Sequence, residues 1–312
     1  MKKVIWTNQV GEDVLAPLAG IAEVFMGPGG GDLMPRAEVL RLAADADAIV
    51  NQAELRVDAE LLDAAPRLKI VASVALGTDN MDLDLMTRRG VWATNAADAF
   101  VDATADFTLG LLLGVARRIH EADAYVRSGR WQGFQPGIWD GMLLSGKTLG
   151  IVGLGKIGRA VAQRARAFGM SVLGHSRSAC ADGSGTPLED LLARSDVISI
   201  HVPLTSETRQ FIGAREFALM KRGALFLNTS RGSVVDEGAL VAALQNGHLG
   251  GAGLDVFAKE PEVPAALRQM PNVLLAPHVG GGTRESRLAA RKLCAENVAL
   301  VLQGREPTSP VK

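Results

Sequence analysis

The chain has 312 residues, and because a single hydrophobic core rarely grows beyond about 250 to 300 residues, this length predicts two domains. Its 33 Lys and Arg residues balance 34 Asp and Glu residues, which argues against nucleic acid or an anionic membrane as a partner and favours small molecules or copies of the same chain. The two cysteines, Cys180 and Cys294, suit neither a metal cluster nor a disulfide framework, so we expect reduced thiols, no bound metal and a cytoplasmic protein.

The first elements alternate between short apolar runs and helical segments. Strands are expected at "KVIWT", "EVFMG", "AIVNQ", "LKIVASVA" and "GVWATN", and helices at "PRAEVLRLAADA", "DAELLDAAP" and "DLDLMTRRG". This alternation predicts a parallel sheet covered by helices.

One long helix is expected next, from Asp98 to about Arg118, with Asp102 at or near its N-cap. Its most apolar stretch, Phe107 to Ala116, is shorter than the roughly 20 residues of a membrane span. We therefore expect a soluble protein in which this helix is buried between domains or subunits.

A second set of apolar runs follows the long helix. Strands are expected at "TLGIVG", "MSVLGH", "DVISIHV", "ALFLNTS", "GAGLDV" and "NVLLAPHV", and the last helix at "TRESRLAARKLCAENVALVLQG". The pattern predicts an α/β protein with two Rossmann-like domains, doubly wound parallel sheets and a cleft between them. Residues 1–97 plus 284–312 would form a flavodoxin-like substrate-binding domain, and residues 98–283 a dinucleotide-binding domain.

A glycine turn, Gly153-x-Gly155-x-x-Gly158, lies between an apolar strand and a helical pattern. In this context the glycines permit a tight turn and close approach of a pyrophosphate, which the helix N-terminus faces. The spacer residues expected to share in cofactor binding are Leu154, Lys156 and Ile157.

The next strand ends in Ser176, Arg177 and Ser178, where an NAD-preferring domain carries an acid. Two hydroxyls and a guanidinium fit a phosphate dianion, because arginine offers a charge-assisted fork of donors. These residues therefore predict NADP(H) as the cofactor.

Three polar residues follow successive strands of the same sheet. His278, in "LLAPHVGGGT", is the candidate proton donor, Glu260 would orient its imidazole and raise its pKa, and Arg231 could grip a carboxylate bidentately. His201 lies within an apolar run and is interpreted as a wall of the cofactor pocket or a satisfied core residue.

The segments "GLGKIG", "NTSRGSVVDEGAL", "GGAGLDVFAKEP" and "LAPHVGGGT" resemble, in order and spacing, those of the D-isomer-specific 2-hydroxyacid dehydrogenases. Within that family the chain is most similar to NADPH-dependent glyoxylate, hydroxypyruvate and hydroxyphenylpyruvate reductases, and the likeness covers nearly the whole chain. The resemblance implies reduction of a small 2-oxo acid to a D-2-hydroxy acid by hydride transfer. It also implies a homodimer joined largely through the long helix and its extension near "YVRSGRW".

By the same resemblance, Arg231 would bind the substrate's carboxylate and carbonyl, and His278, paired with Glu260, would be the acid in reduction. The backbone around Ala75, Leu76 and Gly77 would hold the substrate carboxylate. The further residues implied for the cofactor pocket are Thr104, Val202, Pro203, Thr208, Asn228, Thr229, Ser230, Asp255 and Gly280.

Two features depart from the family pattern: Leu76, Gly77 and Thr78 replace a frequent Gly-Val-Asp, and three glycines, residues 280–282, follow His278. Two alternatives stay open. A D-3-phosphoglycerate dehydrogenase would want a cation near Asn51 or Arg56, and a dinucleotide-sensing corepressor would not need Arg231, Glu260 and His278 together.

Overall fold

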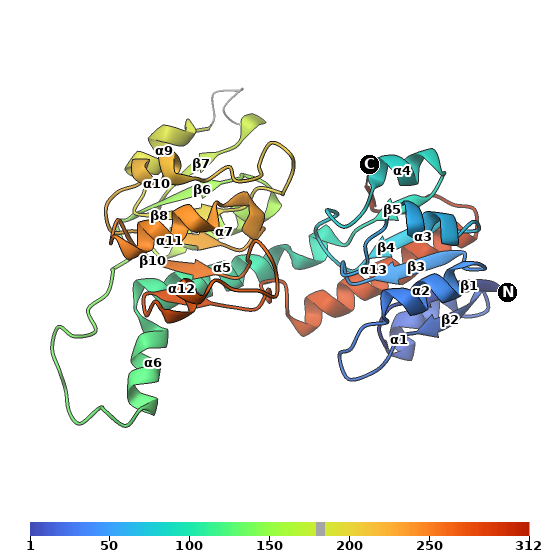
Figure 1. Ribbon diagram of the computed structural model, residues 1–312, viewed down its shortest axis with the longest axis horizontal. Helices are drawn as coiled ribbons and strands as arrows, with labels where there is room; N and C mark the ends of the chain where they lie inside the picture. The colour runs from blue at the N-terminus through green and yellow to red at the C-terminus, as the bar shows by residue number, and fades with distance from the viewer. Residues whose placement is uncertain (179–184, 312) are drawn as a thin grey trace. The chain divides into compact units, whose positions relative to one another are not determined.

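The computed structural model describes residues 1–178 and 185–311, so Cys180 lies outside the described residues (Figure 1). The chain forms two compact units: unit 1 comprises Met1–Phe100 and Thr283–Lys312, and unit 2 comprises Val101–Gly282. The first change of unit comes after Phe100 rather than after residue 97 because Ala99 and Phe100 pack against the core of unit 1. Cys294, in unit 1, is a buried free thiol.

The sheet of unit 1 has the strand order β12-β5-β4-β3-β1-β2. Its parallel strands, all expected from the sequence, are β1 (Lys2–Trp6), β2 (Ala22–Met26), β3 (Ala48–Asn51), β4 (Ile70–Ser73) and β5 (Trp92–Thr94). The antiparallel edge strand β12 (Pro310–Val311) was not expected. A strand of two residues is too short to show a periodic pattern in the sequence. It is held in place by a hydrogen bond from Asn297 to Ser309 and by one from Ser309 to the Asn95 carbonyl.

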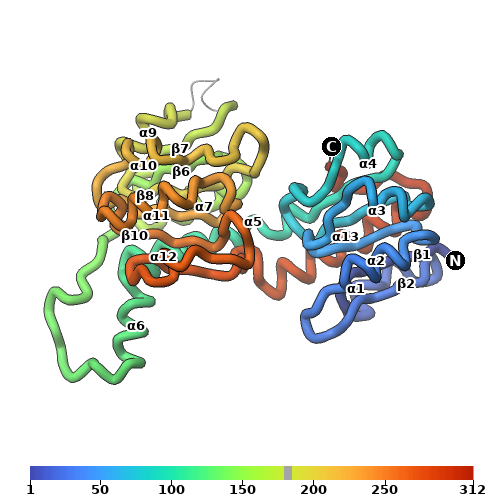
Figure 2. Tube along the Cα trace, in the orientation of Figure 1, coloured from blue at the N-terminus to red at the C-terminus, as the bar shows by residue number. Residues whose placement is uncertain are grey.

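Helices cover both faces of this sheet. On one face α1 (Glu12–Leu15), η1 (Ala16–Leu18), η2 (Ala97–Phe100) and the returning helix α13 (Arg284–Leu302) enclose a core that includes Val4 and Trp6. On the other face α2 (Arg36–Ala43), α3 (Ala59–Ala64) and α4 (Leu83–Arg88) pack over Ile5 and Ile49. Side chains that alternate along each strand thus contribute to two hydrophobic cores, one on each face of the sheet. Figure 2 shows the C-terminal helix α13 among the N-terminal elements of this unit.

The sheet of unit 2 is entirely parallel, with the order β11-β10-β9-β8-β6-β7. Its strands, again in the expected places, are β6 (Thr148–Val152), β7 (Ser171–His175), β8 (Val197–Ile200), β9 (Ala224–Asn228), β10 (Leu249–Leu254) and β11 (Val273–Leu275). The order reverses at β6, so the doubly wound prediction is confirmed. A ligand-binding crevice is expected at the carboxyl end of such a switch point.

The helices of unit 2 also form two layers. One face carries α9 (Leu188–Arg194), α10 (Ala214–Leu219), α11 (Glu237–Gln245) and α12 (Ala265–Gln269). The other face carries α5 (Val101–Ala116) and α7 (Lys156–Ala167). A short helix η3 (Gly232–Val234) follows β9.

The long helix agrees with its prediction at its start and differs from it in apolar length. Asp102 lies in the first turn of α5, near the N-terminus of the helix as expected, and forms an ion pair with Arg164. The expectation from the sequence rested on Phe107 to Ala116 alone, which is too short to cross a membrane. The whole helical stretch Ala97–Ala116 is long and apolar enough to do so, by length and composition alone. Because α5 packs on β9, β10 and α7, it is a core helix of unit 2.

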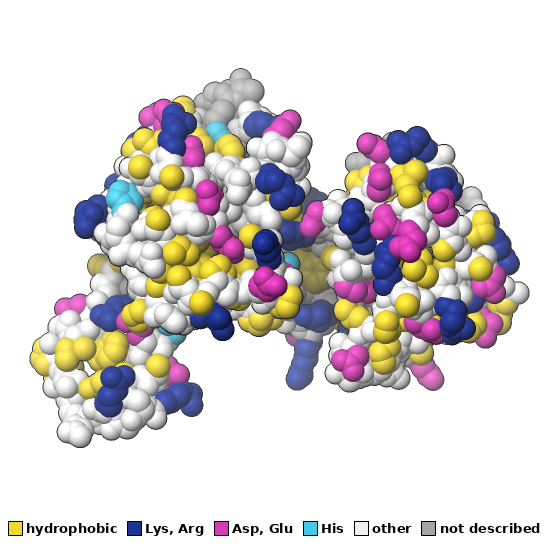
Figure 3. Space-filling model, in the orientation of Figure 1, with side chains coloured by type: hydrophobic (Ala, Val, Ile, Leu, Met, Phe, Trp, Pro, Cys, Tyr) yellow, Lys and Arg dark blue, Asp and Glu magenta, His cyan; other side chains and the backbone are white. Residues whose placement is uncertain are grey.

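An arm projects from the rest of unit 2 in Figures 1 and 2. It consists of α6 (Ile119–Arg127) and the segment 128–143, and it begins where Arg118, with φ of 52°, interrupts the helix. Apolar side chains lie on its surface, as Figure 3 shows at the lower left, and the exposed ones are Ile119, Val126, Trp131, Phe134, Ile138 and Leu143. The family resemblance implies a contact between subunits near these residues.

Candidate active site

The glycine turn joins β6 to α7. Gly153 has φ of 110°, which only glycine adopts readily, and its N–H donates to the His175 carbonyl at 2.8 Å. A Cβ on Gly158 would lie 2.0 Å from the Gly153 carbonyl oxygen. The N-cap of α7, Gly155, offers no side-chain cap, and the first turn holds no acid. Its backbone N–H groups are available to an anion, so the turn fits a dinucleotide pyrophosphate.

The end of β7 is the predicted phosphate contact. Ser176 and Ser178 have their hydroxyl oxygens 3.4 Å apart. The Arg177 side chain is 83% exposed and forms an ion pair with Glu207, which lies in the loop after β8 and was not among the predicted site residues. The sequence carried no signal for this contact, because the two residues are separated by 30 positions.

The loops after β8 and β9 bring several predicted cofactor residues together. The Ser230 hydroxyl donates to the Val202 carbonyl, and the Thr208 hydroxyl donates to the Pro203 carbonyl at 2.6 Å. Asn228 accepts from the Ser230 N–H at 3.0 Å. In the same region the Thr229 and Thr108 hydroxyl oxygens lie 3.0 Å apart, which connects the β9 loop to α5.

Asp255, after β10, organises the segment that carries the candidate acid. Its carboxylate accepts from the Val279 N–H at 2.8 Å and the Gly280 N–H at 2.7 Å, and its carbonyl accepts from the His278 N–H. Burial raises the pKa of Asp255, and the two N–H donors oppose that only in part. Thr104 belongs to the same group, because a Cβ on Gly280 would lie 3.7 Å from its methyl carbon.

His278 and Glu260 are in direct contact, with His278 Nδ1 2.7 Å from Glu260 Oε2. The other carboxylate oxygen, Oε1, accepts from the Phe257 N–H at 3.0 Å, which fixes the acid. The hydrogen bond that His278 donates to Glu260 raises the pKa of His278 despite the opposing effects of burial and of the Arg231 charge. For Glu260, burial would raise the pKa, but the His278 and Phe257 hydrogen bonds outweigh it and the pKa is lowered. The pair therefore favours a charged imidazolium, which is a competent proton donor.

The backbone of His278 has φ of 55°, a left-handed conformation that is unusual for a residue with a side chain. The three hydrogen bonds to Asp255 hold the segment in this conformation. Backbone outliers that the surroundings hold in place cluster at functional sites, so this geometry supports a role for the exposed face of the imidazole.

Arg231 follows β9, and its guanidinium donates to the Ser230 carbonyl at 2.9 Å. Its charge acts on both His278 and Glu260. The next residue, Gly232, lets this segment approach the one after β10, since a Cβ there would lie 1.9 Å from the Phe257 carbonyl carbon. The sequence shows that a glycine follows Arg231, but it does not show that this glycine lies against the Phe257 carbonyl.

His201 is a partly buried histidine with a hydrogen-bond partner. Its Nε2 lies 2.8 Å from the Ser199 hydroxyl, and burial lowers the pKa of the imidazole to about 4. Such a group stays neutral near pH 7, so it lacks the charge expected of the proton donor. Its carbonyl packs against Gly153, which places its backbone beside the glycine turn.

The predicted carboxylate loop of unit 1 follows β4. The Leu76 carbonyl accepts from Asn95 at 2.8 Å, and the Ala75 carbonyl accepts from the Ala96 N–H at 2.9 Å. Ala75, Leu76 and Gly77 are only partly buried. Their backbone is therefore held in place and remains accessible.

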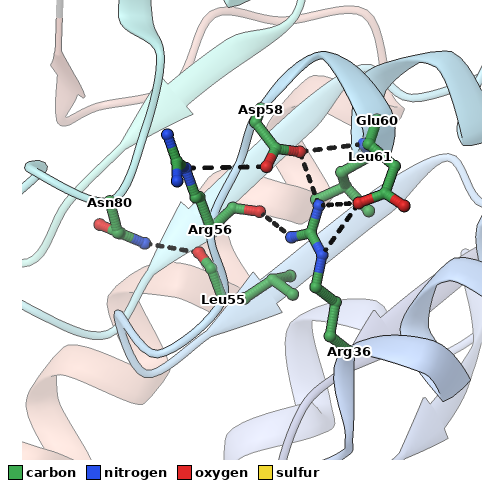
Figure 4. Close-up of polar contacts among 7 residues, drawn as sticks. All are labelled: Arg36, Leu55, Arg56, Asp58, Glu60, Leu61 and Asn80. Carbon is green, nitrogen blue, oxygen red and sulfur yellow. Dashed lines mark hydrogen bonds and ion pairs between the residues drawn. The ribbon is translucent and has the colours of Figure 1, made fainter.

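A second loop of unit 1, residues 52–58, is joined to the first (Figure 4). Asn80 donates to the Leu55 carbonyl at 2.8 Å, and the Val57 N–H donates to the Asn80 carbonyl at 2.8 Å. Arg36, at the start of α2, donates to the Arg56 carbonyl, to Asp58 at 2.6 Å and to Glu60 at 2.8 Å. Arg36 thus supports the loop at residues 52–58, which Asn80 joins to the loop that carries Ala75 to Gly77.

Of the two positions considered for the cation of a D-3-phosphoglycerate dehydrogenase, Asn51 carries no charge and Arg56 is an exposed arginine. Asn51 is fully buried, and its side-chain oxygen accepts from the Ala53 N–H at 2.7 Å. Arg56 lies 3.7 Å from the Asp58 carboxylate.

The chain is similar to known proteins over most of its length. Residues 109–280 match the domain described as "D-isomer specific 2-hydroxyacid dehydrogenase, NAD binding domain". The chain is 46% identical to a glyoxylate reductase of Thermococcus litoralis over 89% of this chain and 87% of the relative. A glyoxylate reductase of Thermococcus kodakarensis is 43% identical over 99% of this chain and 96% of the relative.

Solved structures show the same fold. A protein from Thermus thermophilus aligns with a TM-score of 0.91 and 42% identity over 99% of this chain and 100% of that chain. An NADPH-dependent glyoxylate/hydroxypyruvate reductase from Sinorhizobium meliloti, in complex with NADP and malonate, aligns with a TM-score of 0.84 and 33% identity, covering 99% of this chain and 96% of that chain.

Proposed function

Because the chain belongs to the D-isomer-specific 2-hydroxyacid dehydrogenase family, we propose that it is an NADPH-dependent reductase of glyoxylate, hydroxypyruvate or a related small 2-oxo acid. The product is the D-2-hydroxy acid. The observation that carries the proposal is the 2.7 Å contact between His278 and Glu260, in the unit that contains the glycine turn and Arg231. A corepressor has no need for such a pair.

Each polar residue has a distinct role in this proposal. The glycine turn, the end of β7 and the loops after β8, β9 and β10 hold the dinucleotide, which supplies the hydride. Arg231 binds the substrate carboxylate and polarises the carbonyl, and the backbone of Ala75 to Gly77 binds the carboxylate as well. His278 donates the proton to the carbonyl oxygen while Glu260 keeps the imidazolium charged.

The preference for NADP(H) over NAD(H) rests on Arg177. Its exposed guanidinium follows β7, where an NAD-preferring domain would carry an acid. The Sinorhizobium meliloti relative, described as NADPH-dependent, was solved with NADP, which supports the same preference here.

The proposal extends to assembly and location. A homodimer would cover the apolar side chains of the arm, and a cytoplasmic location suits the reduced thiols expected from the sequence.

Two variants test the catalytic assignment. General acid catalysis typically contributes about 10² to 10⁴ in rate, so His278→Ala should lose that much in kcat, while its NADPH dissociation constant moves by less than about tenfold. Arg231→Ala should raise the KM for the oxo acid and lower kcat, because the carboxylate loses its donors. Stopped-flow turnover and fluorescence titration measure both effects.

The substrate panel is glyoxylate, hydroxypyruvate and aryl pyruvates. Near wild-type turnover of every acid by His278→Ala would show the assignment to be wrong. A wild type that binds NADPH but reduces none of them would instead favour the sensor.

A further inference from the structure

We propose that Glu207 is a second determinant of cofactor choice: its carboxylate competes with the 2′-phosphate of NADPH for the Arg177 guanidinium and accepts from the ribose hydroxyls of NADH. The inference rests on the proposed use of Arg177 as the phosphate contact. Glu207 is the acid that the end of β7 lacks, supplied from a different loop.

The ion pair spans the glycine turn. The strands β7 and β8 are the two neighbours of β6 in the sheet, so Arg177 and Glu207 approach from opposite sides of the turn that follows β6. Gly153 contacts both sides, because its N–H donates to the His175 carbonyl and its Cα faces the His201 carbonyl. The pair therefore lies at the crevice where the adenosine part of a dinucleotide is expected.

The loop that carries Glu207 is well ordered by its own hydrogen bonds. Thr208 donates to the Pro203 carbonyl at 2.6 Å and accepts from the Thr205 N–H at 2.8 Å. The Glu207 N–H donates to the Thr205 hydroxyl at 3.3 Å. The backbone position of Glu207 opposite β7 is consequently set by the loop, while its side chain is free to exchange partners.

Charge decides which partner Arg177 takes. The Arg177 and Glu207 side chains are 83% and 66% exposed, and an ion pair so accessible to water contributes little to stability. A phosphate dianion forms stronger charge-assisted bonds with arginine than a single carboxylate does, so NADPH displaces Glu207. NADH has no phosphate, and its ribose hydroxyls are donors for which Glu207 is a suitable acceptor.

The test compares Glu207→Gln with a matched control. Glu189→Gln alters a similar exposed pair in unit 2, between Glu189, 62% exposed, and Arg215, 72% exposed. Dissociation constants of NADPH and NADH are measured by fluorescence titration of the full-length protein at low and high salt, together with kcat/KM for each cofactor. The same measurements on Arg177→Ala and on the double variant Arg177→Ala/Glu207→Gln complete a double-mutant cycle.

Removing the competing carboxylate is expected to tighten NADPH binding about two- to fivefold at low salt, with a smaller gain at high salt. NADH binding should weaken, because the ribose hydroxyls lose a charged acceptor, and Glu189→Gln should match the wild type. The gain should disappear in the Arg177→Ala background, because the competition acts through that guanidinium.

Two results would overturn the inference, and they can be told apart from failure of the proposed function. An unchanged NADPH/NADH ratio in Glu207→Gln removes Glu207 from cofactor choice, and a full gain in the Arg177→Ala background shows that Glu207 does not compete for the Arg177 guanidinium. In both cases the proposed preference stands. If the wild type uses both cofactors equally and Arg177→Ala changes nothing, the proposed preference itself fails and the competition with it.

Discussion

At the scale of single residues, the ionisation of His278 depends on one neighbour. The hydrogen bond donated to Glu260 is the largest effect on the His278 imidazole and raises its pKa, while burial and the Arg231 charge lower it. Below that raised pKa the imidazolium is present and reduction can proceed, and above it the donor is lost. The activity profile should therefore fall on the alkaline side.

Substituting Glu260→Gln should move this alkaline limb to lower pH. The amide cannot supply the negative charge that stabilises the imidazolium, so the His278 pKa falls towards or below its ordinary value. The pH dependence of kcat/KM for oxo-acid reduction measures the shift. Glu237→Gln is the control, since Glu237 accepts from the Ala258 N–H in the same segment. An alkaline limb in Glu260→Gln that coincides with the wild type would contradict the pairing.

At the scale of elements, Arg36 connects the start of α2 to the loop before α3, and that loop is joined to the one carrying Ala75 to Gly77 (Figure 4). We therefore interpret Arg36 as a positioning residue for the carboxylate loop. Its side chain is only 31% exposed and bonds three groups at once, which a single surface ion pair does not do.

The Arg36→Ala variant should raise the KM for the oxo acid several-fold and leave the NADPH dissociation constant unchanged. We expect it to lower the free energy of unfolding by about 1 kcal/mol. Arg41→Ala is the control, because Arg41 lies on the same helix and pairs with Glu38. Steady-state kinetics and denaturant unfolding separate the two effects. A loss of stability without a change in KM would show that Arg36 has only a structural role. The conservative variant Arg36→Lys should restore part of the wild-type KM.

At the scale of the whole molecule, the arm exposes large apolar side chains, with Trp131 60% and Phe134 89% exposed. Contiguous exposed apolar surface of this kind usually marks a contact with another chain. In the proposed homodimer the second copy of this chain covers it.

Replacing both Trp131 and Phe134 by Glu should shift the protein from dimer to monomer, because charged groups would be buried without partners. Sedimentation velocity over a range of concentrations measures the change. Phe168→Glu is the control, since Phe168 is 43% exposed but lies at the end of α7, outside the arm. A double variant that sediments like the wild type would remove the arm from the interface.

The sequence by itself determined the fold class, the family and the order of the candidate site residues. Every parallel strand of the two sheets was predictable, because apolar periodicity and glycine turns reflect local backbone geometry. The positions of Arg231, Glu260 and His278 followed from the same pattern, since the carboxyl ends of parallel strands share one edge of a sheet.

Only the tertiary structure decided which side chains meet at that edge. The contacts of Arg177 with Glu207, of Asp255 with the Gly280 N–H and of Arg36 with Glu60 join residues 30, 25 and 24 positions apart. The edge strand β12 also depends on hydrogen bonds between distant segments. Such contacts leave no periodic trace in the chain, because their energy comes from atoms that come together only after the sheets have formed.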